Sequence, residues 1–165
     1  MNSMNPTAKG RWLAQLERAL PAPTQLPLSN VHAIGPFENA GYQGLLTTYP
    51  PEQETDLAAT YQGKVTEVSW HRTPGLDGAQ EDPVDLSLHV PTEPWSVLYF
   101  YAEVEVDAPQ IAEVLVGSPG MILAWANGQL ALAPMVPHPA NLQDDRVLIE
   151  LQPGTNTLRL KLHVG

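Results

Sequence analysis

Strict alternation of apolar residues constrains the fold of this chain more than any other feature of the sequence. The clearest case is SVLYFYAEVEV (96–106), in which every second residue from Leu98 to Val106 is apolar. Side chains of a β-strand point alternately to opposite faces of the sheet, so this row predicts a strand with one continuous buried face. The intervening residues change from Val97 and two tyrosines to Glu103 and Glu105, so we expect the second face to be covered at one end and wet at the other.

The end of the chain repeats this pattern. In NTLRLKLHV (156–164), three leucines and a valine alternate with Arg159, Lys161 and His163. We expect the apolar row to point into the core and the three basic side chains to point outward. Each fully buried leucine or phenylalanine contributes roughly 1.5–3 kcal/mol, which makes the two rows major sources of stability.

Turn signals divide the rest of the sequence into short strands. Asn127-Gly128 interrupts an apolar stretch, and both residues tolerate the positive φ of a type I′ turn, so 121–126 and 129–133 are predicted to form a hairpin. Pro153-Gly154 fits a type II turn, in which glycine takes the position of positive φ. The 17 prolines and 12 glycines are spread along the chain, which favours many turns over long helices.

Further strands are predicted at 31–35, 63–72, 84–90, 111–117 and 146–152. Together these segments make about nine short strands with no alternation of strands and helices, which is typical of all-β proteins. The expected fold is an antiparallel β-sandwich, in which each sheet hides one apolar face against the other.

One helix is expected, at the N-terminal end. Thr7 can cap TAKGRWLAQLERAL (7–20), and Pro21 and Pro23 end it. The residues that share its apolar face are Trp12, Leu13, Leu16 and Leu20. We therefore expect residues 1–24 to form a helix and a proline-rich linker, and residues 25–165 to form the β-sandwich domain.

Composition excludes several classes of partner and site. The net charge is −10, from 18 acidic and 8 basic residues, and an acidic surface repels phosphate, so we expect no nucleic-acid partner. No apolar run approaches the ~20 residues of a membrane-spanning helix, so we expect no membrane insertion. The chain has no cysteine, which excludes disulfides and cysteine-bound zinc. No signal peptide is visible in MNSMNPTAKGRW, and the compartment stays open.

Six segments of the chain match, in order, the motifs of a known family. They are IGPFENAG (34–41), YPPEQETDL (49–57), YQGKVTEVSW (61–70), VLYFYAEVEV (97–106), AWANGQLA (124–131) and LQPGTNTLRLKL (151–162). In this order they resemble the galactose-binding-like jelly-roll modules of large multidomain bacterial proteins. Two positions depart from the family pattern: 117–120 reads GSPG in place of an acidic turn, and 31–33 reads VHA where relatives often have tryptophan.

The resemblance implies a jelly-roll β-sandwich related to the sugar-binding accessory domains of glycosidases, in exported or cell-envelope proteins. We therefore expect a non-catalytic accessory module, not an enzyme, that binds a carbohydrate or a neighbouring protein domain without a cofactor. One alternative is a purely structural spacer domain of a larger bacterial protein. The least favoured alternative is a glycan-active hydrolase, which would need two carboxyl groups about 5–10 Å apart in a cleft.

Aromatic residues beside turn-forming residues are the candidate recognition surface, because sugars stack on exposed rings. We name Tyr42, Trp70 and Trp95 as candidate ligand-binding residues on this ground. His71 is added because it follows Trp70 beside a long loop. Catalytic residues are not assigned.

Other residues of these types have a structural reading. Tyr49 and Tyr61 are expected to seal the long loop at 35–57 against the sandwich, and Trp125 is expected to pack in the core, with a ligand platform as the alternative for each. The five histidines stand singly, so no metal site is expected. A structural calcium ion at Asp144-Asp145 is the one exception considered, although the sequence lacks a DxDxDG spacing there.

Overall fold

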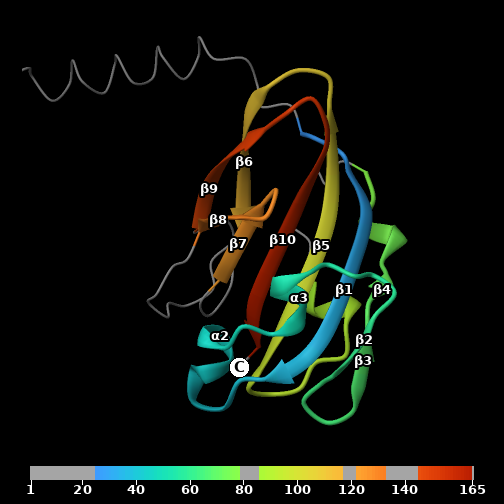
Figure 1. Ribbon diagram of the computed structural model, residues 1–165, viewed down its shortest axis with the longest axis vertical. Coiled ribbons are helices and arrows are strands. Elements are labelled where there is room, and N and C mark those ends of the chain that lie inside the picture. Colours follow the sequence, from blue (N-terminus) through green and yellow to red (C-terminus); the bar gives the residue numbers. More distant parts are fainter. Residues whose placement is uncertain (1–24, 79–85, 117–121, 133–144, 165) are drawn as a thin grey trace, which may run out of the picture.

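The computed structural model describes residues 25–78, 86–116, 122–132 and 145–164. Over these residues the protein is mostly antiparallel β-sheet with a few short helices, which confirms the predicted all-β class (Figure 1). The predicted helix at 7–20 and the linker up to residue 24 lie outside the described residues. Within the described ranges, no helix has the length and apolar character needed to cross a membrane.

The strands and short helices follow one another along the chain as follows. The strands are β1 (Leu28–Glu38), β2 (Thr60–Gln62), β3 (Glu67–Ser69), β4 (His71–Arg72), β5 (Ser96–Val106), β6 (Gln110–Val116), β7 (Ile122–Ala126), β8 (Gln129–Leu132), β9 (Asp145–Leu151) and β10 (Gly154–Val164). The short α-helices are α2 (Gln43–Leu46) and α3 (Pro50–Gln53), and the 3-10 turns are η1 (Ala40–Tyr42), η2 (Pro74–Leu76) and η3 (Leu86–His89).

The largest sheet has six strands in the order β4-β1-β5-β10-β7-β8. Its two central strands are the two segments with the clearest alternation, β5 and β10, which pair along their whole length from Ser96 opposite Val164 to Val106 opposite Gly154. The β6 and β9 strands form a second, two-stranded sheet, and β2 and β3 form a third. Figure 1 shows β6 and β9 on one side of the six-stranded sheet, near β7 and β8.

The aliphatic face of the six-stranded sheet packs toward β6 and β9. Its buried side chains come from β1, β5, β7 and β10, and include Leu98, Phe100, Ile122, Ala124, Leu158 and Leu160. Val114 of β6 packs against this cluster and also against a second cluster, which contains Val104, Val106, Ile149 and Leu151. The two sheets therefore share an apolar interior, and the fold is sandwich-like.

The opposite face of the six-stranded sheet is covered by the chain between β1 and β4. Its cluster joins Ile34, Phe37, Leu45, Val68, Trp70, Val97, Tyr99 and Tyr101. Tyr49 and Tyr61 pack against this cluster, which confirms that they seal the loop. On β5, Val97 and Tyr99 are fully buried whereas Glu105 is exposed, so this face is covered at one end and wet at the other, as predicted.

The prediction for the basic row of β10 was wrong. Its side chains do lie on the face opposite the leucines, but Lys161 and His163 are buried and Arg159 is half-buried. The reason is that the segment between β1 and β2 lies across this face, so a polar row that looks outward in the sequence is covered in the fold. Alternation shows which face a side chain is on, but not whether that face is covered.

The two predicted turns are both present. Asn127 and Gly128 have φ values of 49° and 79°, as a type I′ hairpin requires, and Gly154 has a φ of 96°. The side chain of Asn127 donates from Nδ2 to Asn156 Oδ1 at 2.9 Å and accepts at Oδ1 from the backbone N–H of Thr157, also at 2.9 Å. Asn156 Nδ2 in turn donates to the carbonyl oxygen of Gln152 at 2.8 Å, so the two turns are tied together.

Two strand predictions need correction. The segment 84–90 was predicted as a strand, but Leu86–His89 forms a 3-10 turn, with Leu86 partly buried and Val90 buried. A spacing of four between inward apolar residues fits a helical turn better than a strand. The segment predicted as one strand at 63–72 begins with a turn, in which the N–H of Gly63 donates to the Thr66 carbonyl, and then gives the separate strands β3 and β4.

Candidate functional site

The chain between β1 and β2 is held against the sheet by charged side chains of β10. Lys161 is fully buried, and its Nζ donates to the carbonyl oxygens of Leu45 at 3.2 Å and Thr47 at 2.7 Å. The same Nζ forms an ion pair with Glu52 Oε1 at 2.5 Å. A single lysine thus connects α2, the residue that follows it, and α3 to the centre of the sheet.

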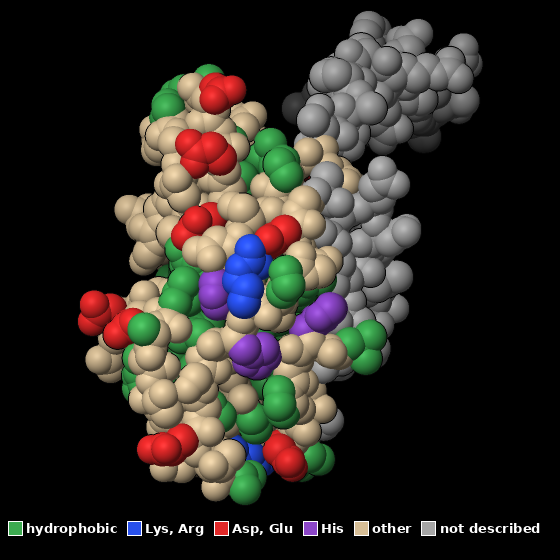
Figure 2. Space-filling model, turned by 90° about the vertical axis from the view of Figure 1, so that its right-hand side faces the viewer, with side chains coloured by type: hydrophobic (Ala, Val, Ile, Leu, Met, Phe, Trp, Pro, Cys, Tyr) green, Lys and Arg blue, Asp and Glu red, His purple; other side chains and the backbone are tan. Residues whose placement is uncertain are grey.

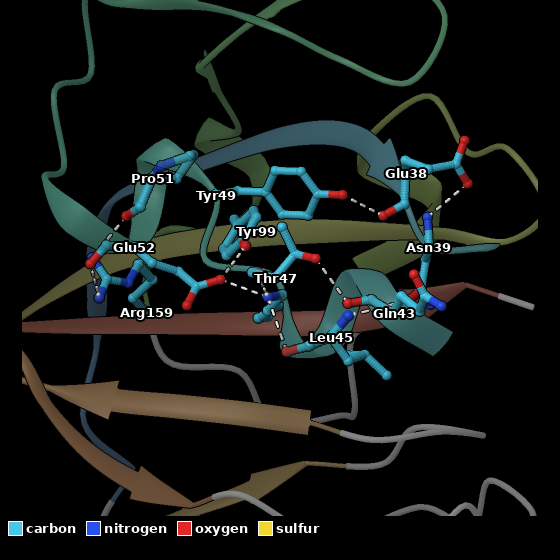
Figure 3. Close-up of polar contacts among 11 residues, drawn as sticks. Glu38, Asn39, Gln43, Leu45, Thr47, Tyr49, Pro51, Glu52, Tyr99 and Arg159 are labelled. Carbon is cyan, nitrogen blue, oxygen red and sulfur yellow. Dashed lines mark hydrogen bonds and ion pairs between the residues drawn. The ribbon is translucent and has the colours of Figure 1, made fainter. Parts of the chain in front are cut away.

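Glu52 completes this buried group, which we call the Lys161 clamp (Lys161, Glu52 and Tyr99). The phenolic O–H of Tyr99 donates to Glu52 Oε1 at 2.5 Å (Figure 3). Burial and the hydrogen bond to Glu52 raise the pKa of Tyr99 well above its usual range, and burial lowers the pKa of Lys161 against the opposing effect of Glu52. Every donor of Lys161 has an acceptor, so this lysine fixes the loop and is not a free amine.

Arg159 makes a second set of contacts to the same loop. Its guanidinium donates to the carbonyl oxygens of Pro51 at 2.8 Å and Glu52 at 3.1 Å, and to the Thr55 hydroxyl at 3.2 Å. It also lies 4.8 Å from the centre of the Trp125 ring. Trp125 is therefore half-buried beneath a cation, which favours the packing role predicted for it over a ligand platform.

A buried asparagine fixes the other end of the loop. Asn39 is fully buried, its backbone N–H donates to the Trp95 carbonyl at 3.0 Å, and its Oδ1 accepts from the N–H of Leu45 at 3.2 Å. That acceptor role turns Nδ2 toward His163, whose Nδ1 lies 2.7 Å away. Burial lowers the pKa of His163, and an unprotonated Nδ1 is the form that can accept from Asn39.

Two exposed aromatic rings lie directly over this buried pair. Tyr42 and Trp95 are 37% and 46% exposed, and their ring centres lie 5.4 Å apart in a T-shaped contact. The His163 ring lies beneath both, with centre-to-centre distances of 5.0 Å to Tyr42 and 6.3 Å to Trp95. We call Tyr42 and Trp95 the aromatic pair.

Both members of the aromatic pair have an unusual backbone. Their φ values are 63° for Tyr42 and 56° for Trp95, in the left-handed region that bulky residues rarely occupy. Such a conformation costs of the order of 1–3 kcal/mol and persists only where the surroundings hold it in place. Around Trp95 this support includes Lys64, whose Nζ donates to the carbonyl oxygens of Pro94 at 2.6 Å and Trp95 at 2.8 Å.

The other two predicted site residues lie apart from the aromatic pair. Trp70 is buried and contacts the ring of Tyr101 edge-on, with centres 6.4 Å apart. His71 lies on β4, opposite Ala33 of β1, and its Nε2 is 3.0 Å from the carbonyl oxygen of His89. Figure 2 shows the side of the molecule to which β4 belongs, where histidine side chains gather beside a basic side chain. The fold thus brings Tyr42 and Trp95 together, and it places Trp70 and His71 away from them.

The described residues give little to hold a metal ion. Among them, no group of three or more histidine, aspartate or glutamate side chains is arranged around a common point. Asp144 of the calcium hypothesis lies outside the described residues. Of the acidic loop residues, Glu52 is taken up by the ion pair with Lys161.

Sequence reasoning missed the residues that support the aromatic pair. Asn39 and His163 are 124 positions apart, and no local pattern connects them. The one available signal is that Asn39 stands within FENAGY, a turn-rich stretch where a buried amide often satisfies backbone groups.

Comparisons with known proteins add no assignment to this geometry. A scan against protein-family models found no match. Searches of curated proteins and of solved structures also found no matching protein. The site itself must therefore support any proposal about function.

Proposed function

We propose that this protein is a non-catalytic binding module that contacts its ligand through the aromatic pair. The observation that carries the proposal is the pair itself: two large rings, partly open to solvent, stand in contact at one end of the sheet on left-handed backbone. Strained residues cluster at ligand-binding positions, because a surrounding structure must be dedicated to holding them.

The support beneath the rings favours recognition over a passive surface role. Asn39, His163 and Lys64 fix the backbone and the underside of the pair before any ligand arrives. A preformed platform loses little side-chain freedom on binding, and tyrosine and tryptophan combine an apolar ring with a polar edge. Both properties suit a ligand that has apolar faces and hydroxyl groups.

The proposed ligand is a neutral glycan. The net charge of −10 disfavours anionic ligands, and sugar rings stack on exposed aromatic side chains. The resemblance to galactose-binding-like jelly-roll modules points to the same class, and we propose that the finer fold is this jelly roll. The positions of the family motifs on β1, β5, the β7–β8 hairpin and β10 support that assignment.

Screening the intact chain on a glycan array tests the proposal, with each hit then titrated by calorimetry. We expect Trp95→Ala and Tyr42→Ala each to weaken binding by about 30-fold, or about 2 kcal/mol, as for aromatic residues at the centre of a binding site. Leu46→Ala is the matched control, because Leu46 is exposed on the same short segment as Tyr42. Its affinity should equal that of the parent chain.

Two results would count against this function. Binding that survives both aromatic substitutions would place the ligand elsewhere on the molecule. Silence of the intact chain on every glycan would overturn carbohydrate binding and favour the structural-spacer alternative. A protein ligand would be distinguished by binding that depends on Trp95 but occurs only with a neighbouring domain of the parent protein.

A further inference from the structure

A buried asparagine decides which hydrogen bond His163 can make. The backbone N–H of Leu45 can only donate, and it points at Asn39 Oδ1 across 3.2 Å. The amide nitrogen of Asn39 is therefore the atom that faces His163 Nδ1, 2.7 Å away. Because an amide nitrogen is also a donor only, Nδ1 has to accept. This contact exists only while the imidazole of His163 is neutral.

A proton on His163 Nδ1 would leave two donors facing each other. Turning the Asn39 amide over does not solve the conflict, because its nitrogen would then face the N–H of Leu45. Asn39 is fully buried and His163 is 6% exposed, so water is poorly placed to replace the lost hydrogen bond. One of the two contacts of the Asn39 side chain must therefore break when His163 is protonated.

The charged groups nearest to His163 are already paired with one another. Lys161, two residues earlier on the same face of β10, forms an ion pair with Glu52 at 2.5 Å. Lys64 lies 3.5 Å from Glu38. No ion pair or hydrogen bond joins His163 to a carboxylate among the described residues, so nothing there compensates for an added positive charge.

Burial lowers the pKa of His163, and contact with the backbone of Ser96 opposes this effect only in part. The other groups in contact with the imidazole include the rings of Tyr42 and Trp95. These rings would attract an imidazolium and offset part of the cost of charging it, but they supply no acceptor for Nδ1 in the plane of the ring. The neutral form is the resting state near neutral pH, and the proton is taken up on acidification.

Loss of the Asn39 contacts would act on both rings of the aromatic pair. The carbonyl oxygen of Asn39 accepts from the N–H of Tyr42 at 3.0 Å, and its own N–H donates to the Trp95 carbonyl at 3.0 Å. Its side chain also holds α2, which begins directly after Tyr42. Both residues of the pair have left-handed backbone that persists only where the surroundings hold it, so a shift of Asn39 should let the rings separate.

We propose that proton uptake by His163 opens the aromatic pair and releases its ligand, so that the site binds near neutral pH and releases in acidic surroundings. The inference rests on the proposed ligand site at Tyr42 and Trp95, and adds the condition under which that site is active. The opening itself needs no ligand, because it follows from the contacts of Asn39 alone. The opening and the binding of a glycan can therefore be tested separately.

Fluorine NMR of the full chain labelled with fluorotryptophan tests the opening without a ligand. The Trp95 signal is assigned by its loss in Trp95→Phe. We expect it to move on acidification with a midpoint below the usual histidine value of about 6.5, together with the imidazole signals of His163. In His163→Gln, whose side-chain oxygen can accept from Asn39 at every pH, the signal should stay in place. His71→Gln, on β4 away from the pair, is the matched control and should titrate like the parent chain.

Asn39→Asp is a second variant, with the opposite expectation. One carboxylate oxygen can accept from the N–H of Leu45 and the other from a protonated His163, so acidification should strengthen the contact. We expect the Trp95 signal of this variant to keep its closed position over the pH range in which the parent chain opens. A purely structural role of Asn39 would not produce this reversal.

Repeating the glycan array and its titrations at about pH 7 and about pH 5 measures the release. We expect the affinity of the parent chain to fall by about tenfold, the effect of one proton taken up over a full pH unit, and that of His163→Gln to change much less.

Three results would decide against the proposal. They are a Trp95 signal that does not move, a signal that moves equally in the parent chain and in His163→Gln, and a glycan affinity that is independent of pH while the signal moves. A moving Trp95 signal in a chain that is silent on every glycan would support the opening and overturn the carbohydrate function alone.

Discussion

The two faces of the six-stranded sheet are covered in different ways. One face meets β6 and β9 through aliphatic side chains that make no directional contact. The other, which we call the polar face, meets a loop through an apolar cluster around Phe37 and Tyr99. In addition, it holds the loop through charged and polar side chains with defined acceptors, chiefly Lys161, Arg159 and Asn39. β10 contributes to both, with leucines on one side and basic residues on the other. The aliphatic face stabilises the fold, and the polar face positions the residues of the proposed site.

The difference predicts how the domain should respond when the contacts of each face are removed. Apolar packing is spread over many small contacts, so its loss lowers the stability of the whole domain. The polar face adds a few strong contacts between the sheet and one segment, so loss of these contacts should release that segment first. Three predictions test this contrast, from the largest expected effect to the smallest.

Removing the lysine of the Lys161 clamp should have the largest effect. Lys161→Ala leaves Glu52 and the carbonyl oxygens of Leu45 and Thr47 buried without their donor, which should lower the free energy of unfolding by about 3–5 kcal/mol. Urea denaturation measures the loss, and limited proteolysis should cut first between residues 43 and 57. The double variant Lys161→Met with Glu52→Gln is the control, since it should recover the part of the loss that comes from the unpaired Glu52 charge, while the carbonyl oxygens of Leu45 and Thr47 still lack their donor. A cost below about 1 kcal/mol for Lys161→Ala would show that the clamp contributes little.

Truncating the aliphatic face should come next. Leu98→Ala removes a fully buried side chain from the cluster beneath β6, and should lower the free energy of unfolding by about 2–5 kcal/mol. In contrast to Lys161→Ala, hydrogen exchange should quicken for all core amides together, without early opening of the loop at 39–57. Early release of that loop in Leu98→Ala would contradict the proposed independence of the two faces.

The smallest effect should come from the titration of His163. Its pKa is lowered in the folded state, so the neutral form is favoured by folding. This contribution is present above the unfolded value of about 6.5 and is lost as the pH falls below it, because the unfolded chain then binds the proton more readily. Chemical denaturation from about pH 8 to about pH 5 should show a steeper loss of stability in the parent chain than in His163→Gln. Identical slopes in the two proteins would contradict a buried, neutral His163 beneath the aromatic pair.

The same contrast separates what the sequence predicts from what it does not. β5 and β10 are predicted by alternation, and the β7–β8 hairpin by Asn127-Gly128. These signals are local, because they lie within consecutive residues of a single segment. The polar face has no such signal. Lys161 contacts residues more than a hundred positions away, so its burial depends on a loop whose path the sequence does not specify.

The candidate site shows the same division. Each ring carries a local signal in the sequence, but the contact between the two rings does not. Tyr42 and Trp95 are predicted at the surface because each stands among turn-forming residues, and such segments run over the outside of a fold. That they would meet depends on the pairing of β1 with β5, which places the ends of the two strands together at Glu38 and Ser96. Trp70 carried the same local signal, but it follows the short β3 strand whose Val68 is buried in the core, and the ring lies in the same cluster.

The hydrogen bonds of Asn127 bear on how this protein would age chemically. An asparagine followed by glycine is prone to deamidation, because the unhindered glycine nitrogen can attack the side-chain carbonyl and expel ammonia. In this hairpin both ends of the Asn127 amide are engaged, the nitrogen by Asn156 and the oxygen by Thr157. The side chain must break both bonds before it can rotate into a reactive position, so the bonds that join the two turns also protect the most labile dipeptide of the hairpin.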